Sequence, residues 1–181
     1  MTLLVEMQRR VSSWAPSRAD ITDWASTALG RKAAGRELAV RVVGPGESRK
    51  LNARYRGRDK PTNVLSFPAP ELPVAPRRDS LRCAPVVPRR AAGASRDSLR
   101  CASVGSDQLP LGDLVICPDV LRVEAREQHK SLRAHWAHLV VHGALHLIGY
   151  DHMHPAESRR MERREIAVLR RLGFPNPYRS S

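Results

Sequence analysis

The sequence predicts an α+β fold, a single domain in which a small mixed β-sheet is packed by helices. Its length of 181 residues is typical of one globular domain that buries a core without disulfide bonds. Short runs rich in Val and Leu alternate with segments whose apolar residues recur at helical spacing. Aromatic residues make up only 4% of the chain, so the core must be built mostly from aliphatic side chains. We therefore expect one domain over residues 1–181.

The N-terminal third predicts two strands with a helix between them. Leu3–Val11 and Glu37–Val43 are short, rich in Val and Leu, and partly alternating, as half-buried strands are. Between them, Ser17 can cap a helix and Gly30 can end it, and the apolar residues at helical spacing are Ile21, Trp24, Ala25 and Leu29. A second short helix is expected from about Glu47 to Tyr55.

Two further strand candidates bracket a segment of different composition. Asn63–Phe67 and Leu114–Cys117 are each followed by a proline, and together they suggest a hairpin. Residues 68–110 hold seven of the 14 prolines and contain RDSLRCA twice, at 78–84 and 96–102. Because this sequence has no apolar periodicity, it buries too little surface to offset its ordering entropy. We expect an insert at about residues 69–109 that forms a mobile loop, with a long ordered hairpin as the alternative.

From Pro118 onward the pattern is helical. One helix is expected from Pro118 to about His129, and a long apolar helix from Leu132 to near Ile148. A final helix follows Pro155, with Ile166, Leu169 and Leu172 expected to face the core. The arginines of this helix are expected to be solvated, with phosphate contacts as the second option; they are Arg159, Arg160, Arg163, Arg164, Arg170 and Arg171.

The charge balance favours a polyanionic partner. Lys and Arg number 31 against 18 acidic residues, and the resulting formal charge of +13 attracts nucleic acid at low salt. A solvated cationic surface with no such partner is the alternative. No run of 18 apolar residues exists and the N-terminus lacks a signal-peptide pattern, so we expect a cytoplasmic protein with no membrane partner. Cys83, Cys101 and Cys117 form no CxxC pair, which predicts structural or incidental thiols and no disulfide-linked partner.

All seven histidines lie between positions 129 and 154, and three of them occur in the string HGALHLIGYDH. Residues four apart on a helix differ by about 40° in azimuth and about 6 Å in rise, so His142 and His146 can direct two imidazoles at one ion. Gly149 can end the helix in a left-handed turn that brings His152 back as a third ligand. The pattern predicts a three-histidine zinc site on the C-terminal helices, with one ion per chain.

Three protein ligands leave one coordination position open, which is typical of catalytic zinc because bound water can reach a pKa of about 7. A closed structural site would need a fourth ligand, for which Asp151 and His154 are candidates; Asp151 could instead accept a hydrogen bond from a ligand. The spacing also matches metzincin metallopeptidases, in which a catalytic Glu follows the first histidine. Here Gly143 holds that position, so peptide hydrolysis is disfavoured. His135 and His138 are expected to be packing or surface residues.

The segment from His142 to His152 resembles the hallmark H-G-x-L-H-L-x-G-Y-D-H of the YbeY family of bacterial rRNA-maturation endoribonucleases, and every fixed position matches. Further resemblance lies in LNARYRGRDKPTNVLSFP at Leu51–Pro68, in LGDLVIC at Leu111–Cys117, and in AHWAHLVV ahead of the first segment. The resemblance covers most of the chain outside the insert, which is longer than expected for this family.

The resemblance implies a compact α+β fold and a metal-dependent endoribonuclease specific for single strands, acting in 16S rRNA 3′-end maturation, ribosome quality control and small-subunit assembly. It implies His142, His146 and His152 as zinc ligands, with His142 counted also as catalytic, and Arg56 as the basic catalytic residue of the cleft. Expected partners are rRNA and the small ribosomal subunit, with a ribosomal protein and an assembly GTPase as further candidates.

Several alternatives stay open at this point. A guanidinium and a divalent ion together can stabilise the charge that an attacked phosphodiester gains, but Arg56 could instead pair with a nearby carboxylate such as Asp59. The nucleophile, a metal-bound hydroxide or the RNA 2′-hydroxyl, is undecided because no general base is evident. A non-catalytic assembly factor, in which zinc fixes the C-terminal helices and the basic surface binds rRNA, is the second hypothesis, and a metallopeptidase is the third.

Overall fold

The computed structural model describes residues 2–70, 109–150 and 154–179, and these belong to one compact unit. Most of the expected insert lies outside the described residues, so its mobility stays a prediction, as does a single domain over the whole chain. The elements in chain order are β1 (Leu4–Arg9), α1 (Arg18–Leu29), the 3-10 helix η1 (Gly30–Ala33), β2 (Arg36–Val42), α2 (Pro45–Arg56), β3 (Val64–Pro68), β4 (Leu109–Ile116), α3 (Pro118–Glu127), α4 (Leu132–Leu147) and α5 (Pro155–Arg171).

The sheet is mixed, as the sequence predicts. Its four strands lie in the order β1-β2-β4-β3; β1, β2 and β4 are parallel, and β3 runs antiparallel to β4. Val64 lies opposite Ile116 and Phe67 opposite Asp113, so β3 and β4 form the expected hairpin arms. The sheet therefore ends at β3, and this edge strand borders the site described below.

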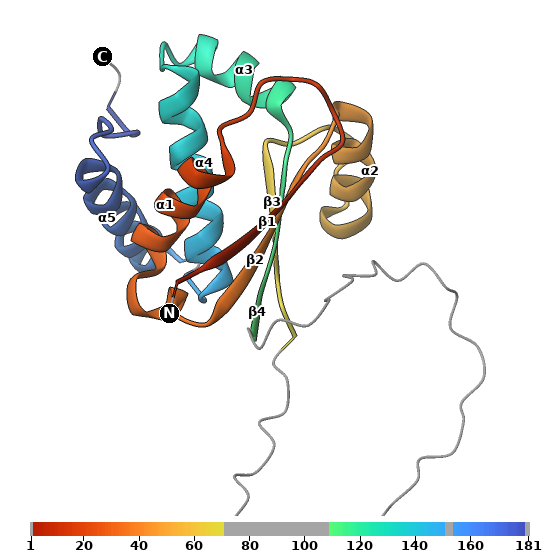
Figure 1. Cartoon of the computed structure of the whole chain (residues 1–181). Coiled ribbons are helices and arrows are strands. Elements are labelled where there is room, and N and C mark those ends of the chain that lie inside the picture. Colours follow the sequence, from red (N-terminus) through yellow and green to blue (C-terminus); the bar gives the residue numbers. More distant parts are fainter. Residues whose placement is uncertain (1, 71–108, 151–153, 180–181) are drawn as a thin grey trace, which may run out of the picture. The chain divides into compact units, whose positions relative to one another are not determined.

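Helices cover both faces of the sheet. Helices α1, α4 and α5 lie on one side of it and α2 on the other (Figure 1). Helix α4 is buried on most of its surface and contacts α1, α3, α5, β3 and β4, so it is the central element of the main core. On the other face a smaller cluster of Val43, Leu65 and Val115 packs against Leu51 of α2.

The element boundaries follow local chemistry. Ser17 caps α1 in a reciprocal capping box with Asp20, and Gly30 ends the helix, as predicted. Strand β4 begins at Leu109, five residues before the predicted start, although Pro110 and Gly112 read as strand breakers. Gly112 has φ +140°, and a Cβ there would lie 2.3 Å from the carbonyl oxygen of Phe67. Only glycine lets the backbones of β3 and β4 approach this closely.

The core face of α5 differs from the prediction. Leu169 is buried and Leu172 packs partly against the core, but Ile166 lies beside the buried stripe rather than on it. The stripe consists of Met161, Glu165, Val168 and Leu169, which share one side of a helix at intervals of four, three and one residues. An acidic residue therefore occupies a core position.

None of the described helices is both long enough and apolar enough to cross a membrane. Cys117 is a free, buried thiol, as expected of a structural cysteine. The other two cysteines lie outside the described residues.

Candidate active site

Helix α4 arranges three histidines in one stripe. Its N-terminus is fixed by Ser131, whose side chain accepts a hydrogen bond from the Ala134 N–H. His138, His142 and His146 follow at intervals of four residues; the ring centroids of the first two are 6.2 Å apart and those of the last two 4.6 Å. The i, i+4 prediction for the pair His142 and His146 is therefore confirmed.

The helix ends as the sequence predicts. Leu147 is its last residue, and Gly149 has φ +89°, a left-handed conformation that glycine adopts without strain. The Tyr150 N–H donates to the carbonyl of Leu145 and turns the chain back after the helix. His152, the third predicted ligand, lies outside the described residues, as does Asp151, so their roles stay predictions.

A buried carboxylate from α5 meets these histidines. Glu165 has no exposed surface, and its two oxygens accept hydrogen bonds from His142 Nδ1 (2.8 Å), His138 Nε2 (3.1 Å) and the Tyr178 hydroxyl. Burial by itself would raise the pKa of Glu165, but these hydrogen bonds outweigh it and lower the pKa to about 2. Glu165 is thus ionised at neutral pH, and in turn burial and this carboxylate raise the pKa of Tyr178.

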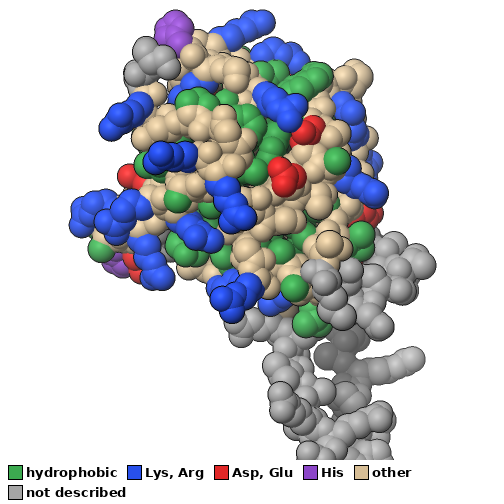
Figure 2. All heavy atoms as spheres, turned by 60° about the vertical axis from the view of Figure 1, so that its left-hand side comes forward, with side chains coloured by type: hydrophobic (Ala, Val, Ile, Leu, Met, Phe, Trp, Pro, Cys, Tyr) green, Lys and Arg blue, Asp and Glu red, His purple; other side chains and the backbone are tan. Residues whose placement is uncertain are grey.

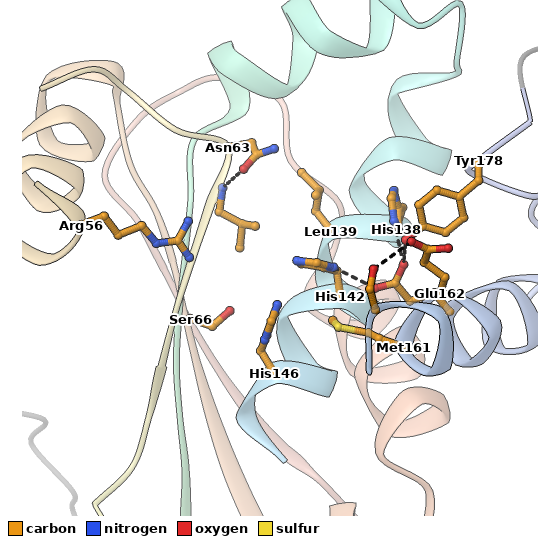
Figure 3. Close-up of a pocket in the computed structure, with 13 residues that line it drawn as sticks. Arg56, Asn63, Ser66, His138, Leu139, His142, His146, Met161, Glu162 and Tyr178 are labelled. Atoms are coloured by element: carbon orange, nitrogen blue, oxygen red, sulfur yellow. Dashed lines mark hydrogen bonds and ion pairs between the residues drawn. The ribbon is translucent and has the colours of Figure 1, made fainter. Parts of the chain in front are cut away.

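A cavity of about 430 Å³ opens beside this cluster. Figure 3 shows its walls: the histidine stripe and α5 lie on one side, and Arg56, Asn63 and Ser66 on the other. The remaining lining residues are Val64, Leu139, Ser158, Met161, Glu162, Glu165 and Tyr178. One cavity thus combines imidazoles, carboxylates and a guanidinium.

Arg56 reaches the cavity past the edge strand β3 from α2, on the opposite face of the sheet (Figure 3). Gly57, with φ +66°, ends α2 directly after Arg56. Asp59, the carboxylate that could have bound Arg56, instead forms a two-pronged pair with Arg49, at 2.7 and 2.6 Å. Within the described part of the chain, the Arg56 guanidinium has no hydrogen bond or ion pair, so it is available to an anion in the cavity.

The loop after Arg56 is held by buried polar side chains of α2. Ser48 donates to the carbonyl of Thr62 and accepts from its N–H, and Asn52 donates to the carbonyl of Lys60. These bonds satisfy loop backbone groups that turn away from any strand. They fix the path from Arg56 to Asn63, which together flank the cavity.

Asn63 is oriented by a second buried network. Its amide donates to both oxygens of Glu124, at 3.1 and 3.0 Å, and Glu124 also bonds His135 Nε2 at 2.8 Å. Burial pulls the pKa of Glu124 upward, but the hydrogen bonds from His135 and Asn63 outweigh it and lower that pKa. His135 is 3% exposed and does not line the cavity, which confirms it as a packing histidine.

The donor atoms fit a metal ion. Among the described residues, His138, His142 and Glu165 offer ligand atoms within 4.8 Å of one another and could hold one. Sequence reasoning assigned His138 to packing or the surface, and the structure instead places it on the cavity wall. It also missed Glu165, although an acid on an otherwise apolar helical stripe is a readable signal.

Gly143 explains why the metzincin glutamate has no counterpart. A Cβ at this position would lie 2.7 Å from Leu114 Cδ2 and 3.2 Å from Ser66 Oγ, because α4 packs directly on the sheet here. No longer side chain fits without displacing the core. The position therefore faces β4 rather than the space beside His142 where a general base would be needed.

The fold and cavity define a small α+β protein whose possible metal ligands are consistent with a metal-dependent nuclease. The family model described as Endoribonuclease YbeY matches residues 6–173, and this chain belongs to that family. The family supports an endoribonuclease, and thus hydrolase, role in rRNA maturation. The solution structure of TM1509 from Thermotoga maritima (VT1, a NESGC target protein) has a similar fold, with TM-score 0.51 and 19% identity over 94% of this chain and 92% of that one.

Proposed function

We propose that this protein is a zinc-dependent, single-strand-specific endoribonuclease that matures the 3′ end of 16S rRNA and serves ribosome quality control in the cytoplasm. Its substrate would be rRNA on the small ribosomal subunit. The observation that carries the proposal is the cavity in which an arginine without an acidic partner faces the histidine stripe of α4. The family membership supports the same reaction class.

We propose His142, His146 and His152 as the zinc ligands. His142 and His146 line the cavity with rings one helical turn apart, and the turn at Gly149 directs the chain back toward them. The alternative set of His138, His142 and Glu165 is less suitable, because both oxygens of Glu165 already accept hydrogen bonds and the residue is fully buried. Ligation by Glu165 would cost these bonds.

The bound ion would supply Lewis-acid stabilisation of a phosphate oxygen and activate water near neutrality. The protein's own residues would do the rest. Arg56 would bind the scissile phosphate from the opposite wall and stabilise the charge that develops there. Asn63 and Ser66, polar side chains on the same wall, are placed to contact the neighbouring ribose or phosphate.

The surface suits an RNA strand. Figure 2, which brings the side carrying α1 and α5 forward, shows many Lys and Arg side chains and few acidic ones. Helix α5 contributes exposed arginines at positions 159, 160, 163, 164, 170 and 171, and its other side lines the cavity. A strand bound there would be held by its phosphates, without base specificity.

The test combines metal content with cleavage of a single-stranded rRNA 3′-end fragment. We expect wild type to hold one zinc per chain and to cut; His146→Ala should lose both zinc and cleavage. Arg56→Ala should keep zinc and lose about 10²–10³-fold in rate. Arg58→Ala is the matched control, an exposed arginine two residues away that does not line the cavity, and it should behave as wild type.

A contaminating ribonuclease would cut equally in all four preparations. Cleavage at the wild-type rate by metal-stripped His146→Ala would overturn the proposal. If wild type binds zinc and rRNA but no preparation cuts, the non-catalytic assembly factor becomes the function. A peptidase is opposed by Gly143, and failure to cleave casein alongside RNA would agree with that.

A further inference from the structure

We propose that Glu165, supported by Tyr178, is a positioning residue that holds the proton of His142 on Nδ1 and thereby directs the lone pair on Nε2 at the metal. The inference rests on the proposed function, since it concerns a ligand of the proposed zinc site. It assigns a role to a residue outside the three-histidine set.

The first argument is that Glu165 gains nothing for stability that an apolar residue would not. It lies on the core stripe of α5 between Met161 and Leu169, with no exposed surface. A buried carboxylate is costly, and apolar residues of similar size often replace buried charged groups without loss of stability. A glutamate in this position therefore needs a reason other than packing.

The second argument is that the hydrogen bonds determine where the ring protons lie. An ionised carboxylate only accepts hydrogen bonds, so each of its three partners must donate. His142 therefore carries its proton on Nδ1, and in the neutral ring the lone pair is on Nε2, which points away from Glu165. Metal-bound histidines are commonly held in this way, by a carboxylate on the nitrogen that does not bind the metal.

The third argument separates His142 from its neighbour. His138 donates its Nε2 proton to the same carboxylate, so its lone pair is on Nδ1. That atom is buried and has no hydrogen-bond partner among the described residues. His138 therefore presents no lone pair to the cavity, and its ring instead packs against Tyr178, with centroids 5.5 Å apart. Glu165 thus orients one ligand while His138 and Tyr178 complete its own hydrogen bonding.

The informative change is Glu165→Met, which keeps the size of the side chain and removes the acceptor. With the acceptor gone, both tautomers of His142 become available, and we expect zinc affinity to fall about 10- to 100-fold. Zinc affinity is measured by competition with a chromophoric chelator. The ¹⁵N NMR signals of His142 in metal-free protein report the tautomer, and urea unfolding of the same samples reports the fold.

Glu124→Met is the matched control, because Glu124 is also a carboxylate that accepts a hydrogen bond from an α4 histidine, but from His135, which does not line the cavity. It should alter stability and leave zinc affinity within about twofold. Tyr178→Phe serves if Glu165→Met fails to fold: it removes one donor to the carboxylate and should weaken zinc binding by a smaller factor.

The outcomes are distinct. Wild-type His142 protonated on Nδ1, with weaker zinc binding in Glu165→Met alone, supports the inference. Equal zinc affinity in wild type and folded Glu165→Met, or a wild-type ring protonated on Nε2, overturns it. Complete loss of zinc from folded Glu165→Met also overturns it, because Glu165 would then be a ligand. Absence of zinc from wild type would instead refute the proposed zinc site, and the tautomer measurement would still decide the hydrogen bonding.

Discussion

Alanine at Gly143 tests the closest contact between α4 and the sheet. In an ordinary helix the change from Gly to Ala stabilises by about 1 kcal/mol. At this position the added Cβ would lie 2.7 Å from Leu114 Cδ2 and 3.2 Å from Ser66 Oγ. Leu114 is fully buried on β4, so its side chain has little room to rotate away.

The expected magnitude is the difference between two opposing effects. Overpacking a well-filled core costs about 1–3 kcal/mol, from which the helix-propensity gain of about 1 kcal/mol is subtracted. Gly143→Ala should therefore be about 0–2 kcal/mol less stable than wild type. Gly46→Ala is the matched control, a helical glycine in α2 whose added Cβ would meet no atom within 4 Å. It should be stabilised by about 0.5–1 kcal/mol.

Urea unfolding of the two variants and wild type, all metal-free, gives both differences. If Gly143→Ala is stabilised as much as Gly46→Ala, the packing of α4 on β4 is looser than described and the reasoning fails. Gly143→Glu, which would restore the peptidase pattern, should lose more than about 3 kcal/mol, because it forces a charge into the same contact. The peptidase reaction is thus excluded by packing as well as by chemistry.

The other predictions concern pH, salt and metal. The folded-state pKa of Glu124 is lowered, so its contribution is present above its unfolded value of about 4.3 and lost as the pH falls through the folded value; Glu124→Gln should flatten that loss in unfolding curves from pH 6 to 3. Replacing both Arg163 and Arg170 by Ala should weaken single-stranded RNA binding and make the slope of log K against log salt less steep by about 0.7 per lost phosphate contact, whereas Arg49→Ala, already paired with Asp59, should change it little. Chelation of zinc should lower the free energy of unfolding by about 2.7 kcal/mol relative to protein at a zinc concentration 100 times Kd, and an unchanged unfolding curve would argue against a folded-state site.

Much of the fold follows from patterns within single segments. The cap at Ser17, the stop at Gly30 and the histidine spacing on α4 are local, and the structure confirms each of them. Strand β4 was predicted too short because the reason for Gly112, the close approach of Phe67, lies in another segment. Local sequence shows that a glycine is present, but only pairing shows that the position requires one.

The site was predictable only where one helix supplies it. His142 and His146 could be placed together because a helix fixes their separation, whereas Arg56 belongs to the site only because α2 ends at the edge of the sheet beside β3. Spacing along the chain carries no information about that approach. For Arg56 the family resemblance supplied what the physical pattern could not.

Two buried glutamates show how tertiary contacts divide residues of the same chemistry between roles. Glu124 and Glu165 both accept a hydrogen bond from a histidine of α4 and both have lowered pKa values. Glu124 also accepts from Asn63, so it ties the loop carrying that residue to the central helix. Glu165 has Tyr178 and a second histidine as partners and lies at the cavity wall. Because their local chemistry is alike, a difference in metal affinity between their variants would arise from position alone, which makes the pair a direct test of the proposed site.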